Sequence, residues 1–278
     1  MKKSELYEDI YGDNFSFGKN WQNFLKGLDD TKIEAAKKYL VHFIGGQEKI
    51  VEKDIIDFGS GSGLMSLCYV LLGAKKVVSI DIDDASIACT EFLRKKYKIS
   101  EDKWEIRKGS VLDKEFVMTL GQFDIVYSWG VIHHSGDMWS GLANIISIVR
   151  EKGYLYVAIY NDSKVLLEGT SPFWVKTKRL YSSSHLLRPF MKGIYTTYLI
   201  LGLLVYGKNP ISYIKNYREN ALRGMDFFID IEDWLGGYPY EYASYEEMSD
   251  FYTRKGFSLV KGVRVRSIAC NEFLFQKS

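Results

Sequence analysis

The amino-acid sequence predicts an α/β fold: a doubly wound, mostly parallel seven-stranded sheet whose last strand is antiparallel, with an inserted helical cap. Three observations predict it. Between residues 54 and 160, short hydrophobic runs alternate with segments of helical periodicity, as in βαβ units. After residue 162 this alternation stops, and helical stretches rich in Tyr, Leu and basic residues follow. Residues 244–278 return to one helix and two strands, which fits a hairpin that completes the sheet.

The predicted strands of the core are near-continuous hydrophobic runs, which suits burial on both faces of a parallel sheet. They are Asp54–Phe58, Lys76–Asp81, Trp104–Lys108, Phe123–Ser128 and Tyr154–Tyr160. Helical periodicity occupies the intervals at Ser62–Leu72, Asp84–Tyr97, Asp113–Leu120 and Asp137–Arg150. Outside the core we expect helices at Thr31–Ile44 and Ser244–Lys255, and strands at Phe257–Val263 and Ala269–Gln276.

This pattern divides the chain into four segments. Residues 1–48 form an N-terminal helical lid or cap segment, and residues 49–161 form the core with the ligand-binding loops. Residues 162–243 are a helical insertion that caps the acceptor side of the site. Residues 244–278 supply the C-terminal helix and hairpin.

Composition excludes several classes of protein. With 46% hydrophobic and 26% charged residues, the chain matches an average globular protein. The 37 basic and 35 acidic residues leave a net charge of +2, which does not favour nucleic acid as a partner. Cys68, Cys89 and Cys270 form no CxxC pair and no disulfide framework, so we expect reduced thiols and no zinc site.

The sequence predicts a cytoplasmic protein without stable membrane insertion. Its N-terminus turns acidic and aromatic where a signal peptide needs an apolar stretch. The longest uncharged run, Gly193–Gly207, is shorter than the roughly 20 residues of a spanning helix. We predict a buried helix there, and peripheral contact with a membrane is the alternative.

A glycine-rich loop, Asp57-Phe58-Gly59-Ser60-Gly61-Ser62-Gly63, lies where the first strand gives way to a helix. Glycines let the backbone turn sharply and admit a ligand close to it, and the helix start offers free N–H groups. Leu64 takes the place of the third small residue of a GxGxxG loop, so the nicotinamide dinucleotide fingerprint is not met. The pattern GxGxG after an acid resembles motif I of the class I S-adenosylmethionine-dependent methyltransferases, which have a Rossmann-like fold.

That resemblance implies S-adenosyl-L-methionine as the cofactor and S-adenosyl-L-homocysteine as the product. It implies that the methionine end of the cofactor is held by Asp57, Gly59, Ser60, Gly61 and Gly63.

The loops after the second and third strands add to the expected cofactor site. Asp81 ends the second strand, where an acid can accept hydrogen bonds from both ribose hydroxyls, and Ile82 follows it. The run Gly109–Asp113 resembles the family's adenine-binding motif, which implies that role for Ser110 and Val111. Asp113 has a simpler interpretation as a helix cap.

The fourth strand ends in Ser128–His134, SWGVIHH, which resembles the family's motif around the transferred methyl group. The resemblance implies that His134 is the catalytic residue, and His133 is a second candidate. A histidine near pH 7 can remove the proton of an attacking hydroxyl, which is usually worth about 100-fold to 10,000-fold. Alternatively both histidines pack, and alignment of the reactants suffices. Together with Asp137 they lack a recognisable metal-ligand spacing, so we expect no metal. The remaining cofactor residues of this motif are Ser128, Trp129 and Gly130.

Further motifs extend the resemblance over nearly the whole chain. SFGKNW near the start, AIYND at 158–162, DWLGGYP at 233–239 and NEFLF at 271–275 are similar to one subfamily of these methyltransferases. Its members have a helical insertion after the fifth strand. The resemblance implies modification of sugars or other polar groups destined for surface polysaccharides.

Aromatic residues beside fixed polar groups suit a polar acceptor such as a sugar, a nucleotide-linked sugar or a small phosphorylated compound. The alternative is that these aromatic residues have only a structural role, in the core of the cap. The substrate-binding candidates are Tyr160, Asn161, Arg223, Trp234 and Tyr238.

We therefore expect O-methylation of a small polar acceptor. The alternatives are an N-methyltransferase, a quinone or phenol O-methyltransferase, a nicotinamide-dependent oxidoreductase, and an inactive cofactor-binding or membrane-peripheral scaffold. The sequence identifies neither the acceptor nor the oligomeric state.

Overall fold

The structure, a computed structural model, describes residues 17–165, 169–217 and 227–278. Contacts between Cα atoms divide the chain into two compact units. The first, here called the sheet unit, contains Phe17–Ser171 and Glu241–Ser278. The second, the helical unit, contains Pro172–Tyr240. Each unit is described by itself.

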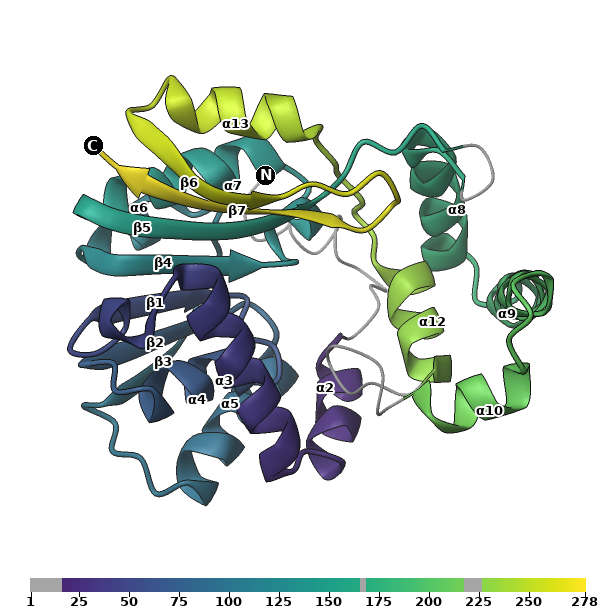
Figure 1. The fold of residues 1–278 in the computed structure, drawn as a ribbon, viewed down its shortest axis with the longest axis horizontal. Coiled ribbons are helices and arrows are strands. Elements are labelled where there is room, and N and C mark those ends of the chain that lie inside the picture. Colours follow the sequence, from purple (N-terminus) through teal and green to yellow (C-terminus); the bar gives the residue numbers. More distant parts are fainter. Residues whose placement is uncertain (1–16, 166–168, 218–226) are drawn as a thin grey trace, which may run out of the picture. The chain divides into compact units, whose positions relative to one another are not determined.

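The sheet unit is built on one seven-stranded sheet with the order β3-β2-β1-β4-β5-β7-β6 (Figure 1). Only β7 is antiparallel to its neighbours, so the predicted Rossmann-like fold is confirmed. The strands are β1 (Asp54–Phe58), β2 (Lys76–Asp81), β3 (Trp104–Lys108), β4 (Phe123–Trp129), β5 (Val149–Tyr160), β6 (Phe257–Val263) and β7 (Cys270–Lys277).

The order of the strands reverses between β1 and β4, and the carboxyl ends of these two strands are where a ligand is expected to bind. β1 pairs with β2 on one side and with β4 on the other, so the chain reverses direction across the sheet after β3. In open α/β sheets, ligands bind outside the carboxyl ends of the strands at such a switch point. The loops after β1, β2 and β4 therefore meet at one edge.

Helices cover both faces of this sheet (Figure 1). Residues of α6, α7 and α13 join the strands in one hydrophobic cluster on one face, with Tyr252 fully buried in it. On the other face α4 packs against α3, α5 and β2, and α2 contacts α5. The helices are α2 (Phe17–Lys26), α3 (Asp30–Ile44), α4 (Leu64–Leu71), α5 (Asp84–Lys96), α6 (Lys114–Thr119), α7 (Met138–Asn144) and α13 (Tyr245–Thr253), with short 3-10 helices at η1 (Gln47–Lys49), η2 (Ile132–His134) and η3 (Ile145–Ile148).

Side-chain caps explain why several of these helices begin where they do. Asp83 accepts a hydrogen bond from the N–H of Ala85 at the start of α5, and Asp113 accepts one from the N–H of Phe116 in α6. These bonds satisfy N–H groups that have no partner within the helix. The interpretation of Asp113 as a helix cap is confirmed.

The predicted helix Asp137–Arg150 is wrong after Asn144. η3 follows, and β5 already begins at Val149, which pairs with Phe123 of β4. The register between these strands shifts before the next pair, Ile125 with Tyr154, so the segment between them bulges. Local composition at Glu151-Lys152-Gly153 resembles a turn, and only pairing with β4 makes it part of a strand.

A cluster of hydroxyl and carboxylate groups joins α3 to the sheet. Tyr39 of α3 and Tyr156 of β5 both donate to the carboxylate of Glu272 in β7, at 2.5 to 2.6 Å. Phe43 stacks on Tyr156 with ring centroids 4.3 Å apart. These contacts hold α3 against β5 and β7.

The helical unit contains α8 (Ser171–Ser183), α9 (Arg188–Val205), α10 (Pro210–Lys215) and α12 (Phe227–Gly236). The ring of Trp174 in α8 lies 5.2 Å from that of Trp234 in α12. The ammonium of Lys178, which is fully buried, lies 3.8 Å from the Trp234 ring centroid and donates to the carbonyl of Trp234. An aromatic and cationic cluster thus forms the centre of the unit.

α9 contains most of the long uncharged run, Gly193–Gly207, which we predicted to be a buried helix. That prediction is wrong, because α9 contains no buried residue. Within the ranges that the structure describes, no helix is long and apolar enough to cross a membrane.

Candidate functional site

The loop after β1 depends on glycine at two positions that approach other elements closely. Gly59 has φ +76° and Gly61 has φ +53°, a region that side chains other than glycine rarely adopt. A Cβ at Gly59 would overlap Val131, which belongs to the loop after β4. A Cβ at Gly61 would lie 2.9 Å from Nε1 of Trp21 in α2. Trp21 belongs to the segment predicted as a lid, but the sequence did not identify it as a site residue.

Asp57 ends a chain of buried hydrogen bonds that crosses the sheet. The indole N–H of Trp104 in β3 donates to Ser79 of β2 at 2.7 Å, and Ser79 donates to Ser66 of α4 at 2.6 Å. Ser66 then donates to a carboxylate oxygen of Asp57 at 2.5 Å. Burial nevertheless raises the pKa of Asp57 from 3.8 to about 7, the bond from Ser66 lowers it, and the charge of Asp81 raises it.

Asp81 receives two backbone donors from the same edge of the sheet. The N–H of Gly61 donates to one carboxylate oxygen at 2.9 Å, and the N–H of Asp83 donates to the other at 3.0 Å. Burial raises the pKa of Asp81 to about 6, although these bonds lower it. A carboxylate has about four acceptor positions, so Asp81 can accept further bonds from a ligand hydroxyl.

Beyond Asp81 lie Ile82, a predicted cofactor residue, and Ser110 and Val111, the predicted adenine-binding residues. Ile82 is 46% exposed, whereas Val111 is buried. The side-chain amide of Asn144 in α7 donates to the carbonyl of Val111 at 2.9 Å, which fixes the backbone of this loop. The hydroxyl of Ser110 accepts from the N–H of Leu112 at 3.2 Å.

Of the three predicted cofactor residues at the end of β4, Ser128 uses its side chain within the sheet. It is fully buried and donates to the carbonyl of Phe58 in β1 at 3.2 Å. Trp129 and Gly130 are partly exposed at the carboxyl end of the strand. The N–H of Gly130 donates to the carbonyl of Ala158 in β5 at 3.1 Å, which fixes the start of the loop.

The two histidines of η2 have different surroundings. His133 is fully buried, its ring centroid lies 3.8 Å from that of Tyr160, and its Nδ1 accepts from the N–H of Tyr160 at 3.2 Å. His134 is partly exposed, with its ring 5.4 Å from that of Tyr160. His133 therefore fixes the loop against β5, whereas the side chain of His134 is partly accessible to solvent.

Glu241 holds this histidine loop in place, a role that the sequence did not reveal. Its backbone N–H donates to the carbonyl of His133 at 2.9 Å. Its carboxylate accepts from the N–H of Met138, the first residue of α7, at 3.0 and 3.1 Å. Burial raises the pKa of Glu241, and the bond from Met138 lowers it. Because the contact spans about 100 residues of sequence, no local pattern could have indicated it.

The five predicted acceptor residues divide between the two units and the residues that are not described. Tyr160 lies at the histidine loop, but the side-chain amide of Asn161 is used by the protein: it donates to the carbonyl of Ser267 and accepts from Asn271, both at 3.0 Å. Trp234 belongs to the central cluster of the helical unit. Tyr238 is also in that unit, and Arg223 lies outside the described residues.

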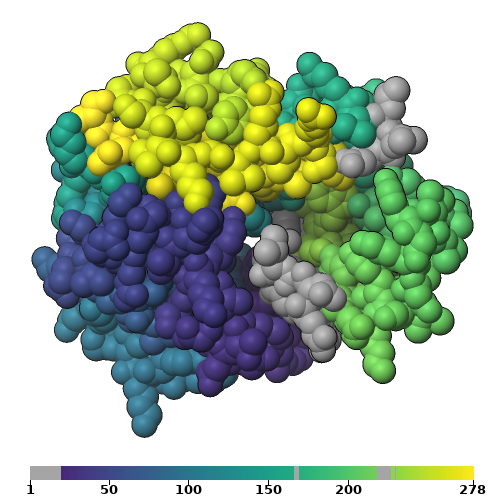
Figure 2. Space-filling model, in the orientation of Figure 1, coloured from purple at the N-terminus to yellow at the C-terminus, as the bar shows by residue number. Residues whose placement is uncertain are grey.

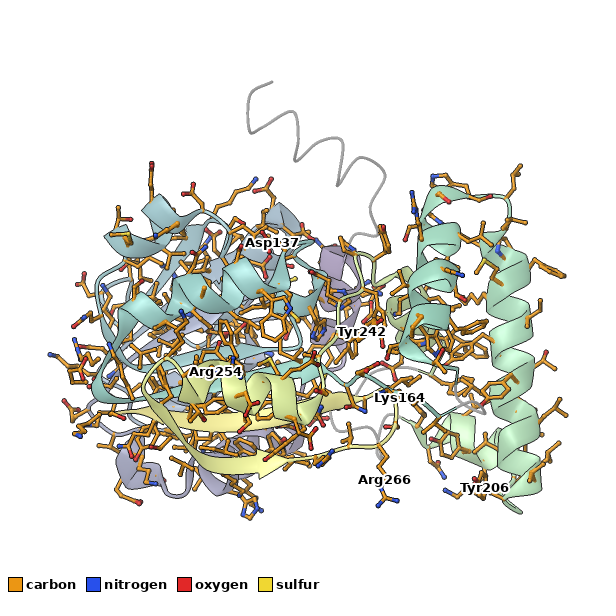
Figure 3. The ribbon with its side chains drawn as sticks, turned by 90° about the horizontal axis from the view of Figure 1, so that it is seen from above. Asp137, Lys164, Tyr206, Tyr242, Arg254 and Arg266 are labelled. Atoms are coloured by element: carbon orange, nitrogen blue, oxygen red, sulfur yellow. The ribbon has the colours of Figure 1, made fainter. Side chains whose placement is uncertain are left out.

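Metal-ligating side chains do not gather in the parts of the chain that the structure describes, where no group of three or more His, Cys, Asp or Glu could hold an ion. Asp137, labelled in Figure 3, instead accepts a hydrogen bond from the N–H of Ser140 at the start of α7, at 3.3 Å.

Comparison with known proteins adds a family and a fold. A family model described as a methyltransferase domain matches residues 51–196. Among curated proteins, the ribosomal protein L11 methyltransferase of Colwellia psychrerythraea is 40% identical over 119 residues, which are 40% of this chain and 39% of that protein. The corresponding protein of a Marinomonas species is 39% identical over 56 residues. The chain spans about a fifth of the length of this second relative, 19%.

Two solved structures resemble the whole chain at low identity. Magnesium protoporphyrin IX methyltransferase from Synechocystis PCC 6803, solved with bound SAH, has a TM-score of 0.57 and 12% identity, over 99% of this chain and 100% of that one. A SAM-dependent methyltransferase from Aquifex aeolicus has a TM-score of 0.50 and 12% identity, over 93% and 98%. At this identity the likeness concerns the fold.

Proposed function

Because the chain belongs to the methyltransferase-domain family, we propose that it methylates an oxygen of a small polar acceptor. The acceptor class is a sugar, a nucleotide-linked sugar or a phosphorylated metabolite, and surface-polysaccharide modification is the process that we propose. The chain is an S-adenosylmethionine-dependent methyltransferase with the Rossmann-like fold of its family. The acceptor and the oxygen as nucleophile are our proposals.

The residues at the edge of the sheet fit S-adenosylmethionine. Asp57 and Asp81 are carboxylates held where ionisation is costly, as their raised pKa values indicate. A ligand with an ammonium and a sulfonium charge favours their ionised forms. Glycine at positions 59 and 61 leaves the space that a Cβ would fill. This pairing of two buried carboxylates with a glycine loop is the observation that carries the proposal.

Each part of the site has a separate task in holding the cofactor. We assign the methionine end to the loop from Asp57 to Gly63, the ribose hydroxyls to Asp81, and the adenine to Ile82 and the loop at Ser110. When bound, the cofactor supplies a methyl group on a positively charged sulfur. The protein therefore has to align the acceptor oxygen with that methyl group and exclude water.

His134 is the residue that we assign to the proton of the acceptor hydroxyl. It is accessible, and its loop is fixed by His133 on Tyr160 and by Glu241. A neutral imidazole at this position accepts the proton as the oxygen attacks, and it releases that proton to solvent afterwards. His133, fully buried, acts as a positioning residue.

Methylation of a protein is the second candidate. It is favoured by the similarity to the L11 methyltransferases, which reaches 40% identity over 119 residues. The aligned part is 40% of this chain, which leaves the choice of acceptor to the remaining residues. A small-molecule acceptor agrees better with the resemblance of the chain to the subfamily that carries SWGVIHH and the helical insertion.

Cofactor binding and methyl transfer test the proposal separately. Calorimetry with S-adenosylhomocysteine and with NAD measures the affinity of the purified chain for each, and we expect binding of the first alone. Incubation with radiolabelled S-adenosylmethionine and a cell extract separated into small-molecule, polysaccharide-precursor and protein fractions then identifies the acceptor class. Label in the protein fraction alone would favour the second candidate.

Two pairs of variants assign the roles. Asp81→Asn should weaken binding of S-adenosylhomocysteine, whereas Asp84→Asn, on an exposed carboxylate close to it in sequence, should not. His134→Ala should retain that affinity and lose turnover by about 100-fold or more. Unchanged turnover would remove His134 from the mechanism, and unchanged affinity in Asp81→Asn would remove the proposed cofactor site.

A further inference from the structure

One face of α9 is apolar along its whole length and exposed. Its large side chains recur at intervals of three or four residues, with Val205 directly after Leu204, which places them on one side of a helix. Figure 3 shows carbon-rich side chains along the side of α9 that faces away from α8, and it labels Tyr206 just beyond the end of the helix. The exposed fractions are 67% for Phe190, 56% for Ile194, 46% for Tyr198, 56% for Leu201, 55% for Leu204 and 84% for Val205.

The opposite face of α9 is the one that packs within the helical unit. Tyr195 lies 5.4 Å from the ring of Trp174 in α8, and Lys192 pairs with Glu232 of α12 at 3.2 Å. The helix is therefore held by its inner face. The large side chains of its outer face are mostly exposed in the described structure, although exposing so many large apolar side chains to water is unfavourable.

The hydrophobic stripe continues onto α10. Ile211 is 80% exposed, and an open hollow of about 670 Å³ lies between the end of α9 and α10. Its walls include Leu204 and Ile214, with Lys208 among the lining residues. None of the residues that line it is a predicted cofactor residue. In Figure 2 the α9–α10 segment, in green, lies on the surface of the molecule.

The charge of this segment is strongly one-sided. Residues 169–217 contain seven Lys or Arg and no Asp or Glu, so the rest of the chain carries 30 basic and 35 acidic residues. Lys176 and Arg179 of α8, Lys208 after α9 and Lys215 of α10 are exposed. A positive segment with an exposed apolar helix face is complementary to a surface that is both negatively charged and apolar beneath.

We propose that the outer face of α9, with α10, binds the surface of a membrane that contains anionic phospholipids. The apolar side chains enter the region between headgroups and acyl chains, and the basic residues contact lipid phosphates. A second copy of the chain suits this face less well, because an isologous contact would bring together the exposed Lys208 and Lys215 of both copies. The helix lies on the membrane and does not cross it.

Vesicle cosedimentation of the full chain tests this proposal. We expect binding to vesicles of phosphatidylcholine mixed with phosphatidylglycerol, little binding to phosphatidylcholine alone, and weaker binding as salt is added. Ile194→Glu combined with Leu201→Glu should lower the partition coefficient by at least about tenfold. Lys208→Gln and Lys215→Gln should each lower it by about fivefold on anionic vesicles.

Phe92→Glu is the matched control, because Phe92 is 52% exposed on α5 of the sheet unit. It should bind vesicles as the parent chain does. Circular dichroism of each variant verifies that α9 still folds. Equal binding to neutral and anionic vesicles, or binding to neither, would overturn the proposal. So would a dimer seen by sedimentation velocity that the α9 double variant dissolves, because the face would then join two copies.

Discussion

Replacing Asp57 by Asn should stabilise the fold at high pH while it removes cofactor binding. Burial raises the pKa of Asp57 from 3.8 to about 7, so the folded chain holds this proton more tightly than the unfolded chain. At about 1.4 kcal/mol per pH unit, ionising Asp57 costs the folded state about 4 kcal/mol. The cost begins as pH rises above the unfolded value and is complete above the folded value.

The pH dependence isolates this effect from other consequences of the substitution. The new amide can still accept the bond from Ser66, but its NH2 group is buried, which costs about 1 to 3 kcal/mol at every pH. Between about pH 5 and about pH 8, the ionisation cost in the parent chain grows by about 2.5 kcal/mol. The advantage of Asp57→Asn should therefore be larger at about pH 8 by this amount.

Urea denaturation followed by circular dichroism measures this difference as the free energy of unfolding of each chain at both pH values. Asp84→Asn serves as the control, because the Asp84 side chain is 81% exposed and solvent screens its charge. Calorimetry with S-adenosylhomocysteine should show that Asp57→Asn no longer binds it. A stability difference that is the same at both pH values would refute the reasoning that burial strains the Asp57 carboxylate.

Three further substitutions test other contacts of the sheet unit. Trp104→Phe removes the first donor of the series of hydrogen bonds that ends on Asp57, so the pKa of Asp57 should rise. The pH midpoint of S-adenosylhomocysteine binding should then move upward. An unmoved midpoint would show that the effect of these hydrogen bonds does not reach Asp57. Gly61→Ala should lower the free energy of unfolding by about 1 to 2 kcal/mol in urea denaturation, because φ is +53° there. Adding Trp21→Ala should restore only the part of this loss that comes from the contact between the new Cβ and Trp21. Full restoration would mean that the backbone is unstrained. Tyr156→Phe removes a 2.5 Å hydrogen bond to Glu272 and should lower the free energy of unfolding by about 1 to 3 kcal/mol. Tyr154→Phe on the same strand is the control. Equal losses in the two variants would show that this hydrogen bond does not stabilise the fold.

The core strands were predictable because their signal is local. A strand buried on both faces is a short run of apolar residues, and β1, β2 and β3 have the boundaries expected from such runs. The glycine loop was equally visible, because a backbone with positive φ favours glycine whatever surrounds it. The start of β5 was not visible, because the pairing of Val149 with Phe123 is set by the neighbouring strand.

The candidate site divides in the same way. The carboxylates Asp57 and Asp81 and the histidine pair could be found because each lies at the carboxyl end of a strand of the expected sheet or within a few residues of it. The different roles of His133 and His134 could not, because adjacent residues of one type differ only in what the fold places around them. The hydrogen bonds of Asn161 were not visible either: its side-chain amide donates to the carbonyl of Ser267 and accepts from Asn271 of β7.

By itself the sequence determined the fold class, the family resemblance and the loops of the candidate site, because apolar periodicity and glycine positions act over a few residues. The tertiary structure decided which side chains are exposed and which distant groups meet. Glu241 holds a loop about 100 residues earlier in the chain, and α9, apolar enough to suggest burial, leaves one face in solvent. The physical reason is that burial and long-range hydrogen bonds depend on neighbours in space, which a linear pattern does not specify.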